Sequence, residues 1–361
     1  MSQFIHMLQS FVWGPGMLIF FLATGIRFTI KSGFFQLTGI RIWLGNTLGV
    51  LFRKREVRKT GEAHVMSQFQ SFCTALAATL GTGNITGVAT ALVFGGPGAI
   101  FWMWVSAFFG MMTNYAENYL GIQYRYQDEH GRWVGGAMVY MERGLGCKPL
   151  AVAFALCCLG ASLGMGNMVQ GNAMAKGLEH AFHVPPFVSG VLCTIGVAVV
   201  ITGGMKRIAG LTEKLVPFMA VLYLGGAIGV LFVFRKEIPG AFALIFSEAF
   251  GLRQAAGGVA GYGVGQAIRM GIARGIFSNE AGLGSSVMAH AQSDVKEPEI
   301  QGMWGILEIF IDTMVVCTIT ALVILVSGVY DPEVFQNHIA NGLEAIDGTT
   351  LTGMAFGKVI P

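Results

Sequence analysis

Two carboxylates stand inside a long apolar run, residues 302–328, that carries no other charge. Glu308 and Asp312 are four residues apart, so a regular α-helix would place them on one face. A charged side chain near the centre of a bilayer costs at least about 2.5 kcal/mol, so it indicates a functional site. Asp312, with Thr313 beside it, lies near the middle of the run and offers hard oxygen ligands that suit Na⁺. A proton carrier and a structural pair with an Arg or a hydroxyl network are the alternatives.

A Gly-Thr-Gly-Asn sequence, Gly81, Thr82, Gly83 and Asn84, occupies the middle of another apolar run. Gly costs about 1 kcal/mol in a helix relative to Ala, and a buried Asn amide needs hydrogen-bond partners. These residues predict an unwound stretch whose free backbone groups face a cavity. Close packing of two helices through small residues is the alternative.

A second Gly-x-Gly-Asn sequence lies at residues 164–167, again within an apolar run, and Gln170 follows it. Asn167 and Gln170 are three residues apart and would share a face of a regular helix. Both amides are therefore expected to line the cavity, unless they only hydrogen-bond a neighbouring helix.

A third interrupted region, residues 257–284, holds nine Gly and is unsuited to one regular lipid-facing helix. A second helix break is expected either at residues 261–265 or at Phe277, Ser278 and Asn279. The residues leave this choice open. Asn279 is also suited to cap a following helix.

The composition is that of a membrane protein. Of 361 residues 53% are apolar and 12% charged, and Gly contributes 52, whereas an average soluble domain has about 25% charged residues. A net charge of +3 is too small for a nucleic-acid-binding protein. The sequence lacks a P-loop and the spacing of a catalytic or zinc triad, so it favours neither an ATP-driven pump nor an enzyme. The six Cys, mostly in apolar runs, are interpreted as packing residues.

Runs long enough to cross a bilayer, about 20 residues each, predict an all-α integral membrane protein with about eight spans. The run at 149–182 would reach about 51 Å as a helix and must tilt. The segment 236–256 carries charges and is expected to be an outer amphipathic helix. The predicted spans are 12–30, 68–94, 98–120, 149–182, 186–204, 214–234, 257–277 and 302–328.

Basic residues set the expected orientation, because short cytoplasmic loops are enriched in Lys and Arg. The basic run 53–59 predicts a cytoplasmic loop after the first span, so the N-terminus is expected outside. Alternation then places the basic loops at 125–148 and 206–214, and Lys296, inside. Residues 331–361 contain no further span, so the predicted bundle looks incomplete.

Four segments together resemble the sodium:alanine/glycine symporter family: residues 81–91 (GTGNITGVATA), 164–173 (GMGNMVQGNA), 274–291 (RGIFSNEAGLGSSVMAHA) and 302–325. The resemblance covers most of the chain. It implies an inverted five-helix repeat of the LeuT type, preceded by one extra span. It also implies import of a small neutral amino acid, alanine or glycine, across the plasma membrane by alternating access, with Na⁺ as the coupling ion and no other cofactor. A gated channel or pore for small polar solutes is the alternative.

The resemblance also assigns residues to roles. Backbone N–H groups at the break of the first repeat helix would hold the substrate carboxylate. The expected substrate-binding residues are Thr82, Gly83, Asn84, Asn167, Gln170, Phe277, Ser278 and Asn279. The expected sodium ligands are Asp312, Thr313, Gly81 and Asn84. Family members usually continue for several more spans, so a truncated product whose second repeat lacks its last three helices is expected.

Overall fold

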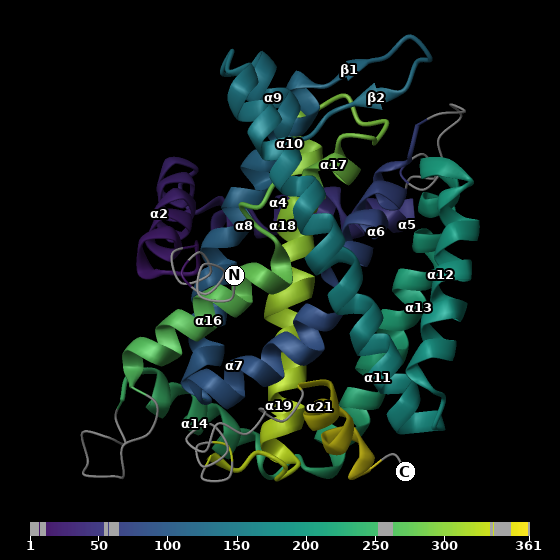
Figure 1. The fold of residues 1–361 in the computed structure, drawn as a ribbon. Helices are drawn as coiled ribbons and strands as arrows, with labels where there is room; N and C mark the ends of the chain where they lie inside the picture. The colour runs from purple at the N-terminus through teal and green to yellow at the C-terminus, as the bar shows by residue number, and fades with distance from the viewer. Residues whose placement is uncertain are drawn as a thin grey trace.

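The structure is a computed structural model that describes residues 12–53, 65–251, 263–332 and 348–359, together with Met7, Val57 and Phe335. Within these residues the chain is almost entirely helical (Figure 1). The departure from the expected all-α fold is a small antiparallel hairpin of strands β1 (Tyr126–Gln127) and β2 (Trp133–Val134). Residues 1–6, ahead of the first predicted span, and most of residues 333–347, after the last one, lie outside the described residues.

The first half of the chain contains one long helix, α8, against which helices from both halves of the chain pack. Helix α2 and the short helices α3 to α5 precede the broken helix α6–η2–α7, and α9 follows the hairpin. The bounds are α2 Pro15–Lys31, α3 Phe35–Thr38, α4 Ile40–Asn46, α5 Leu48–Arg53, α6 Gln68–Thr79, η2 Gly83–Gly87, α7 Val88–Gly95, α8 Gly98–Tyr124 and α9 Ala137–Arg143.

The second half supplies further helices, some of which pack against α8. Here η2, η3 and η4 are π-helical turns within longer helices. The bounds are α10 Lys148–Leu163, η3 Gly164–Val169, α11 Gln170–Phe182, α12 Pro186–Ile201, α13 Gly204–Val233, α14 Ile238–Ala249, α16 Val264–Asn279, α17 Ser286–His290, α18 Pro298–Ile309, η4 Phe310–Cys317, α19 Thr318–Val326 and α21 Gly348–Gly357.

Among the described residues, three unbroken helices are long and apolar enough to cross a bilayer: Lys148–Phe182, Gly204–Val233 and Pro298–Val326. The bent pair Gln68–Thr79 and Gly83–Gly95 meets the same requirement as one broken span. Helices α2, α12 and α16 have 16 or 17 residues, at the lower limit for a span. The count of eight spans therefore stays a prediction.

The break between α6 and η2 is shorter than the unwound stretch that the sequence predicted. Ser67 caps α6 in a capping box with Gln70, and the helix ends at Thr79. Leu80 is extended, and the chain then turns by 47° into η2 and α7. The predicted interruption is thus confirmed just ahead of the predicted stretch, at Leu80, whereas Gly83 already belongs to the π-helical turn.

Three π-helical turns occur in the described residues, and each coincides with a polar motif noted in the sequence. Segment η2 reads GNITG, η3 reads GMGNMV and η4 reads FIDTMVVC. A π turn inserts one extra residue into the α-helical pattern and is frequent at functional sites. The second and third turns leave the long helices Lys148–Phe182 and Pro298–Val326 continuous.

Two predicted boundaries change in the structure. Helix α13 begins at Gly204, so the basic residues expected in a loop at 206–214 lie on a helix instead. Helix α16 continues through Phe277 to Asn279, and Glu280 then adopts a left-handed conformation with φ 54°. Asn279 therefore ends helix α16, and the prediction that it caps the following helix is wrong. Residues 257–262 lie outside the described part of the chain.

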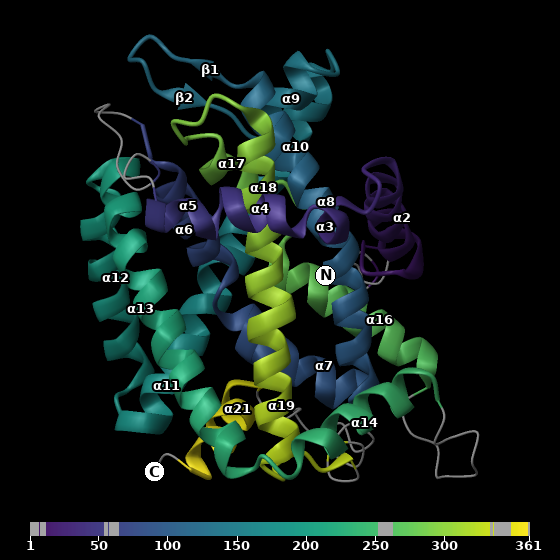
Figure 2. The same cartoon turned by 180° about the vertical axis from the view of Figure 1, so that it is seen from behind.

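The segment expected to lie outside the membrane interior is a short helix. Helix α14 has 12 residues, too few to cross a bilayer. Both views place α14 and α21 at the end of the molecule opposite the hairpin, α9 and α17 (Figures 1 and 2). Helix α21 packs against η2, and Thr349 forms a side-chain hydrogen bond with Thr86 at 2.8 Å.

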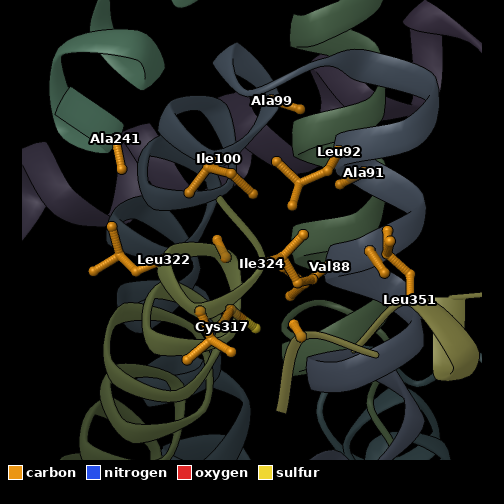
Figure 3. Packing of buried hydrophobic residues seen from close by; sticks show 14 of the residues in the cluster. Val88, Ala91, Leu92, Ala99, Ile100, Ala241, Cys317, Leu322, Ile324 and Leu351 are labelled. Atoms are coloured by element: carbon orange, nitrogen blue, oxygen red, sulfur yellow. The ribbon is translucent and has the colours of Figure 1, made fainter. Parts of the chain in front are cut away.

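The largest apolar core anchors the second half of the broken helix. Figure 3 shows Val88 and Leu92 of α7, Ile100 of α8 and Ile324 of α19 close together, and all four are buried. Helix α16 meets α8 through Gly271, where an added Cβ would lie 2.3 Å from the carbonyl oxygen of Ala99. The core thus holds α7, α16 and α19 at fixed positions around the site.

Candidate functional site

The carboxylate of Asp312 is fully buried and accepts hydrogen bonds from three elements. Asn84 Nδ2 on η2 donates to Oδ1 at 2.7 Å, and the hydroxyl of Ser278 on α16 donates to Oδ2 at 2.9 Å. The adjacent hydroxyl of Thr313 donates to Oδ2 at 2.8 Å. The π turn η2 and the last turn of α16, far apart in the sequence, therefore meet at one carboxylate. We call these four residues the Asp312 cluster.

Further polar groups extend the Asp312 cluster. Asn279 Nδ2 donates to the hydroxyl of Thr313 at 3.1 Å, and Asn279 Oδ1 accepts from the backbone N–H of Ala281 at 3.1 Å. Asn84 Nδ2 also lies 3.1 Å from the backbone oxygen of Asp312. The sulfur of Cys317 lies 3.3 Å from Ser278 Oγ. All six cysteines are free, but Cys317 contacts polar groups as well as filling the core.

The Asp312 cluster is suited to a hard monovalent cation. Its oxygens are one carboxylate, two hydroxyls and a backbone carbonyl, the kinds of ligand that hard cations prefer. Both hydroxyls can turn their lone pairs toward a bound cation while the carboxylate balances its charge. In the described residues, no group of three or more His, Cys, Asp or Glu has the arrangement of a metal site. The donor set therefore fits Na⁺ better than a transition metal.

A small pocket of about 140 Å³ lies beside the break. Thr82, Gly83, Gln170 and Phe277, all predicted as substrate-binding residues, line it, and Glu280 adds a carboxylate. The backbone N–H of Thr82 points to Gln170 Oε1 at 3.4 Å, a long hydrogen bond. The pocket thus combines an accessible backbone donor, an amide and an aromatic face.

The two glycines of the break have different roles. Gly81 lies at the bend, and its backbone N–H donates to Asn84 Oδ1 at 2.9 Å. Gly83 packs against α16, where an added Cβ would lie 2.9 Å from the Cα of Ser278. The interpretation as an unwound stretch therefore applies to Gly81, and the interpretation as close packing applies to Gly83. Gly81 is expected to act by orienting Asn84, and no contact of Gly81 with Asp312 appears in the described residues.

The structure separates two residues that the sequence paired. Gln170 lines the pocket, but Asn167 is exposed and does not line it. Both lie at or beside η3, and the extra residue of a π turn shifts the face on which a side chain emerges. The prediction that spacing by three places both amides in one cavity is therefore wrong for Asn167.

Glu308 and Asp312 likewise point to different groups. Glu308 accepts from Asn114 of α8 and contacts His290 of α17, whereas Asp312 contacts η2 and α16. The π turn η4 begins at Phe310, between the two carboxylates. Sequence reasoning missed Asn114 and His290. The signal available was a His only eighteen residues before an intramembrane Glu.

Broken helices that carry polar residues to a buried site are the architecture of membrane transporters, and this chain is of that class. The sequence profile of the sodium:alanine symporter family matches residues 1–361. The chain belongs to the sodium:alanine symporter family. It is therefore an amino acid symporter of the membrane rather than an enzyme.

Relatives in several organisms support this membership. The sodium/alanine symporter AgcS of Methanococcus maripaludis is 44% identical over 363 residues, covering 99% of this chain and 76% of the relative. An uncharacterized transporter of Haemophilus influenzae is 42% identical over 359 residues, covering 99% of this chain and 74% of the relative. A probable sodium/glutamine symporter, GlnT, of Bacillus subtilis is 38% identical, with 91% of this chain and 66% of the relative covered.

Proposed function

We propose that this protein imports a small neutral amino acid, alanine or glycine, across the plasma membrane together with Na⁺. Sodium binds at the Asp312 cluster, and the amino acid binds in the pocket beside the break. The observation that carries the proposal is the buried carboxylate of Asp312, which accepts hydrogen bonds from η2 and from the last turn of α16. A bound cation therefore draws η2, α16 and η4 together, which couples sodium binding to the shape of the pocket.

The pocket supports a small substrate. Its volume of about 140 Å³ is well below the range of roughly 300–1,000 Å³ typical of drug-sized ligands. The substrate carboxylate would replace Gln170 Oε1 as the acceptor of the hydrogen bond from the backbone N–H of Thr82. This N–H lies at the start of a helical segment, where negative charge is favoured. Glu280 lines the same pocket and would face the substrate ammonium. Phe277 would then limit the size of the side chain.

We also propose an inverted-repeat architecture with alternating access. The break between α6 and η2 and the turn between α16 and α17 are interruptions in corresponding helices of two repeats. In both views α6 lies nearer the hairpin than α7, and α17 lies nearer the hairpin than α16, so the chain passes through the two interruptions in opposite senses, which supports this proposal (Figures 1 and 2). Rocking of one group of helices against the other would expose the pocket to each side in turn.

A thermal-shift screen of the purified protein with the twenty amino acids, with and without Na⁺, tests the proposed function. A ligand that binds only the folded state raises its apparent stability, by about 2.7 kcal/mol at a concentration one hundred times its Kd. We expect alanine or glycine to raise the melting temperature in Na⁺ and to have little effect in K⁺. A channel would show neither saturable binding nor dependence on Na⁺, and that result would refute the symporter proposal.

Cysteine labelling tests the proposed orientation, with the N-terminus outside. In a variant without its native cysteines, Lys296→Cys is expected to be protected from an impermeant reagent added outside, and Lys236→Cys is expected to react. Both native lysines are exposed in the structure, so the side of the membrane on which each one lies decides whether the cysteine reacts. If Lys296→Cys reacted from outside in sealed cells, the proposed orientation would be wrong.

A further inference from the structure

The turn that follows α16, residues 280–285, begins with Glu280, which lines the pocket beside the break. Three residues of this turn have a left-handed backbone: Glu280 at φ 54°, Gly282 at φ 89° and Gly284 at φ 71°. A residue other than glycine keeps that conformation only where its surroundings hold it there. The direction of the Glu280 side chain therefore depends on what fixes the turn.

A buried carboxylate on α8 accepts hydrogen bonds from the backbone of the turn. Glu117 Oε2 accepts from the backbone N–H of Gly282 at 3.1 Å, and the backbone N–H of Gly284 donates to the same carboxylate. Hydrogen bonds between a carboxylate and backbone N–H groups are stronger than those between neutral groups. Glu117 thus holds two peptide groups of the turn in one orientation.

The end of the turn is tied both to Glu280 and to α8. The hydroxyl of Ser285 donates to Glu280 Oε2. The hydroxyl of Ser286, the next residue, donates to Asn114 Oδ1 on α8 at 3.0 Å. Helix α8 therefore holds the middle of the turn through Glu117 and its end through Asn114, and Ser285 restricts the carboxylate of Glu280 directly.

Packing on the other sides of the turn is close but has a different effect. An added Cβ on Gly282 would lie 2.7 Å from the ring of Phe21 on α2, and one on Gly284 would lie 2.8 Å from Ala137 Cβ on α9. These contacts limit how far the turn can move. Hydrogen bonds depend on angle as well as distance, so those to Glu117 also fix the rotation of its peptide groups.

We propose that Glu117 is a positioning residue, which holds the 280–285 turn so that the carboxylate of Glu280 faces the ammonium group of the substrate. The transporter thereby selects amino acids over carboxylates that lack the ammonium. This inference rests on the proposed function, in which Glu280 faces that ammonium. Glu117 is not among the described residues that line the pocket, so it acts through Glu280. A group that is held in place before binding loses less conformational freedom when the ligand arrives.

Propionate, which is alanine without its ammonium group, is the probe that tests this positioning. Thermal-shift titrations of the full chain in Na⁺ give the ratio of the Kd of propionate to the Kd of alanine. Glu117→Ala is expected to weaken alanine binding by about tenfold and to leave propionate binding unchanged, so the ratio falls. Glu117→Gln keeps an acceptor oxygen for the turn and should stay within about threefold of the wild type.

Ser285→Ala is a second variant, which carries the test if Glu117→Ala does not fold. It removes the hydroxyl that holds Glu280 and leaves α8 unchanged, so the ratio should fall in the same direction. Glu142→Ala, on the exposed surface of α9, is the matched control and should keep the wild-type ratio. The thermal shift with Na⁺ alone should persist in all these variants, because none of them changes the Asp312 cluster.

Glu280→Gln separates a failure of this inference from a failure of the proposed function. If Glu280→Gln lowers the ratio while Glu117→Ala and Ser285→Ala keep it, the positioning role is overturned and the proposed function stands. Equal losses in Glu117→Ala and Glu117→Gln, or equal weakening of alanine and propionate, also overturn the positioning role. A wild-type ratio in Glu280→Gln would instead show that Glu280 does not bind the ammonium, as the proposed function requires.

Discussion

Asp312→Asn is expected to raise the Na⁺ concentration needed for half-maximal alanine binding by about 10- to 100-fold. The substitution keeps the size of the side chain and one oxygen but removes the charge that balances Na⁺. Losing an interaction with a charged group costs about 1.5–3 kcal/mol, and each 1.4 kcal/mol corresponds to a tenfold change in affinity. Alanine affinity measured as a function of Na⁺ concentration gives the result directly.

Folding of the Asp312→Asn variant is expected to be preserved. The new amide still accepts from Asn84 through its oxygen, and the hydroxyls of Ser278 and Thr313 can accept from its nitrogen. Asp128→Asn, the same change in the exposed hairpin, is the control and should leave sodium dependence unchanged. Wild-type sodium dependence in Asp312→Asn, or a failure to fold, would make Asp312 a structural residue.

Gly83→Ala is expected to weaken alanine binding in Na⁺ by more than about tenfold. Its Cβ would lie 2.9 Å from Ser278 Cα and 3.2 Å from Ser278 Oγ, and a contact with backbone is not relieved by a change of rotamer. Overpacking of this kind costs about 1–3 kcal/mol and forces η2 and α16 apart. Ser278 then loses its position against Asp312, so sodium and substrate binding weaken together.

The larger Gly83→Leu should abolish alanine binding while membrane insertion stays intact. Gly160→Ala is the matched control, because Gly160 lies in helix α10 with open space around the added Cβ. The comparison of thermal shifts with alanine and Na⁺ in the three variants separates local packing from a general effect of removing a glycine. Alanine affinity equal to the wild type in both Gly83 variants would show that the contact with Ser278 does not matter for binding.

The chain alone was sufficient to predict helices, a break and a buried carboxylate at Asp312. Each of these depends on local properties: the length of an apolar run, the helix cost of Gly81 and the cost of burying Asp312 in hydrocarbon. The pattern around Gly81 could not separate an unwound stretch from close packing. The structure assigns the first interpretation to Gly81 and the second to Gly83, because only the neighbouring helix α16 distinguishes them.

Which side chains meet was decided by tertiary structure. Spacing predicts a shared face only for a regular α-helix, and the π turns η3 and η4 break that rule for Asn167 and for Glu308 with Asp312. Asn84 and Asp312 are 228 positions apart, and their contact depends on α8 holding α16 and α18 in place. A sequence shows that a buried carboxylate needs a partner, but the partner is chosen by the packing of distant helices.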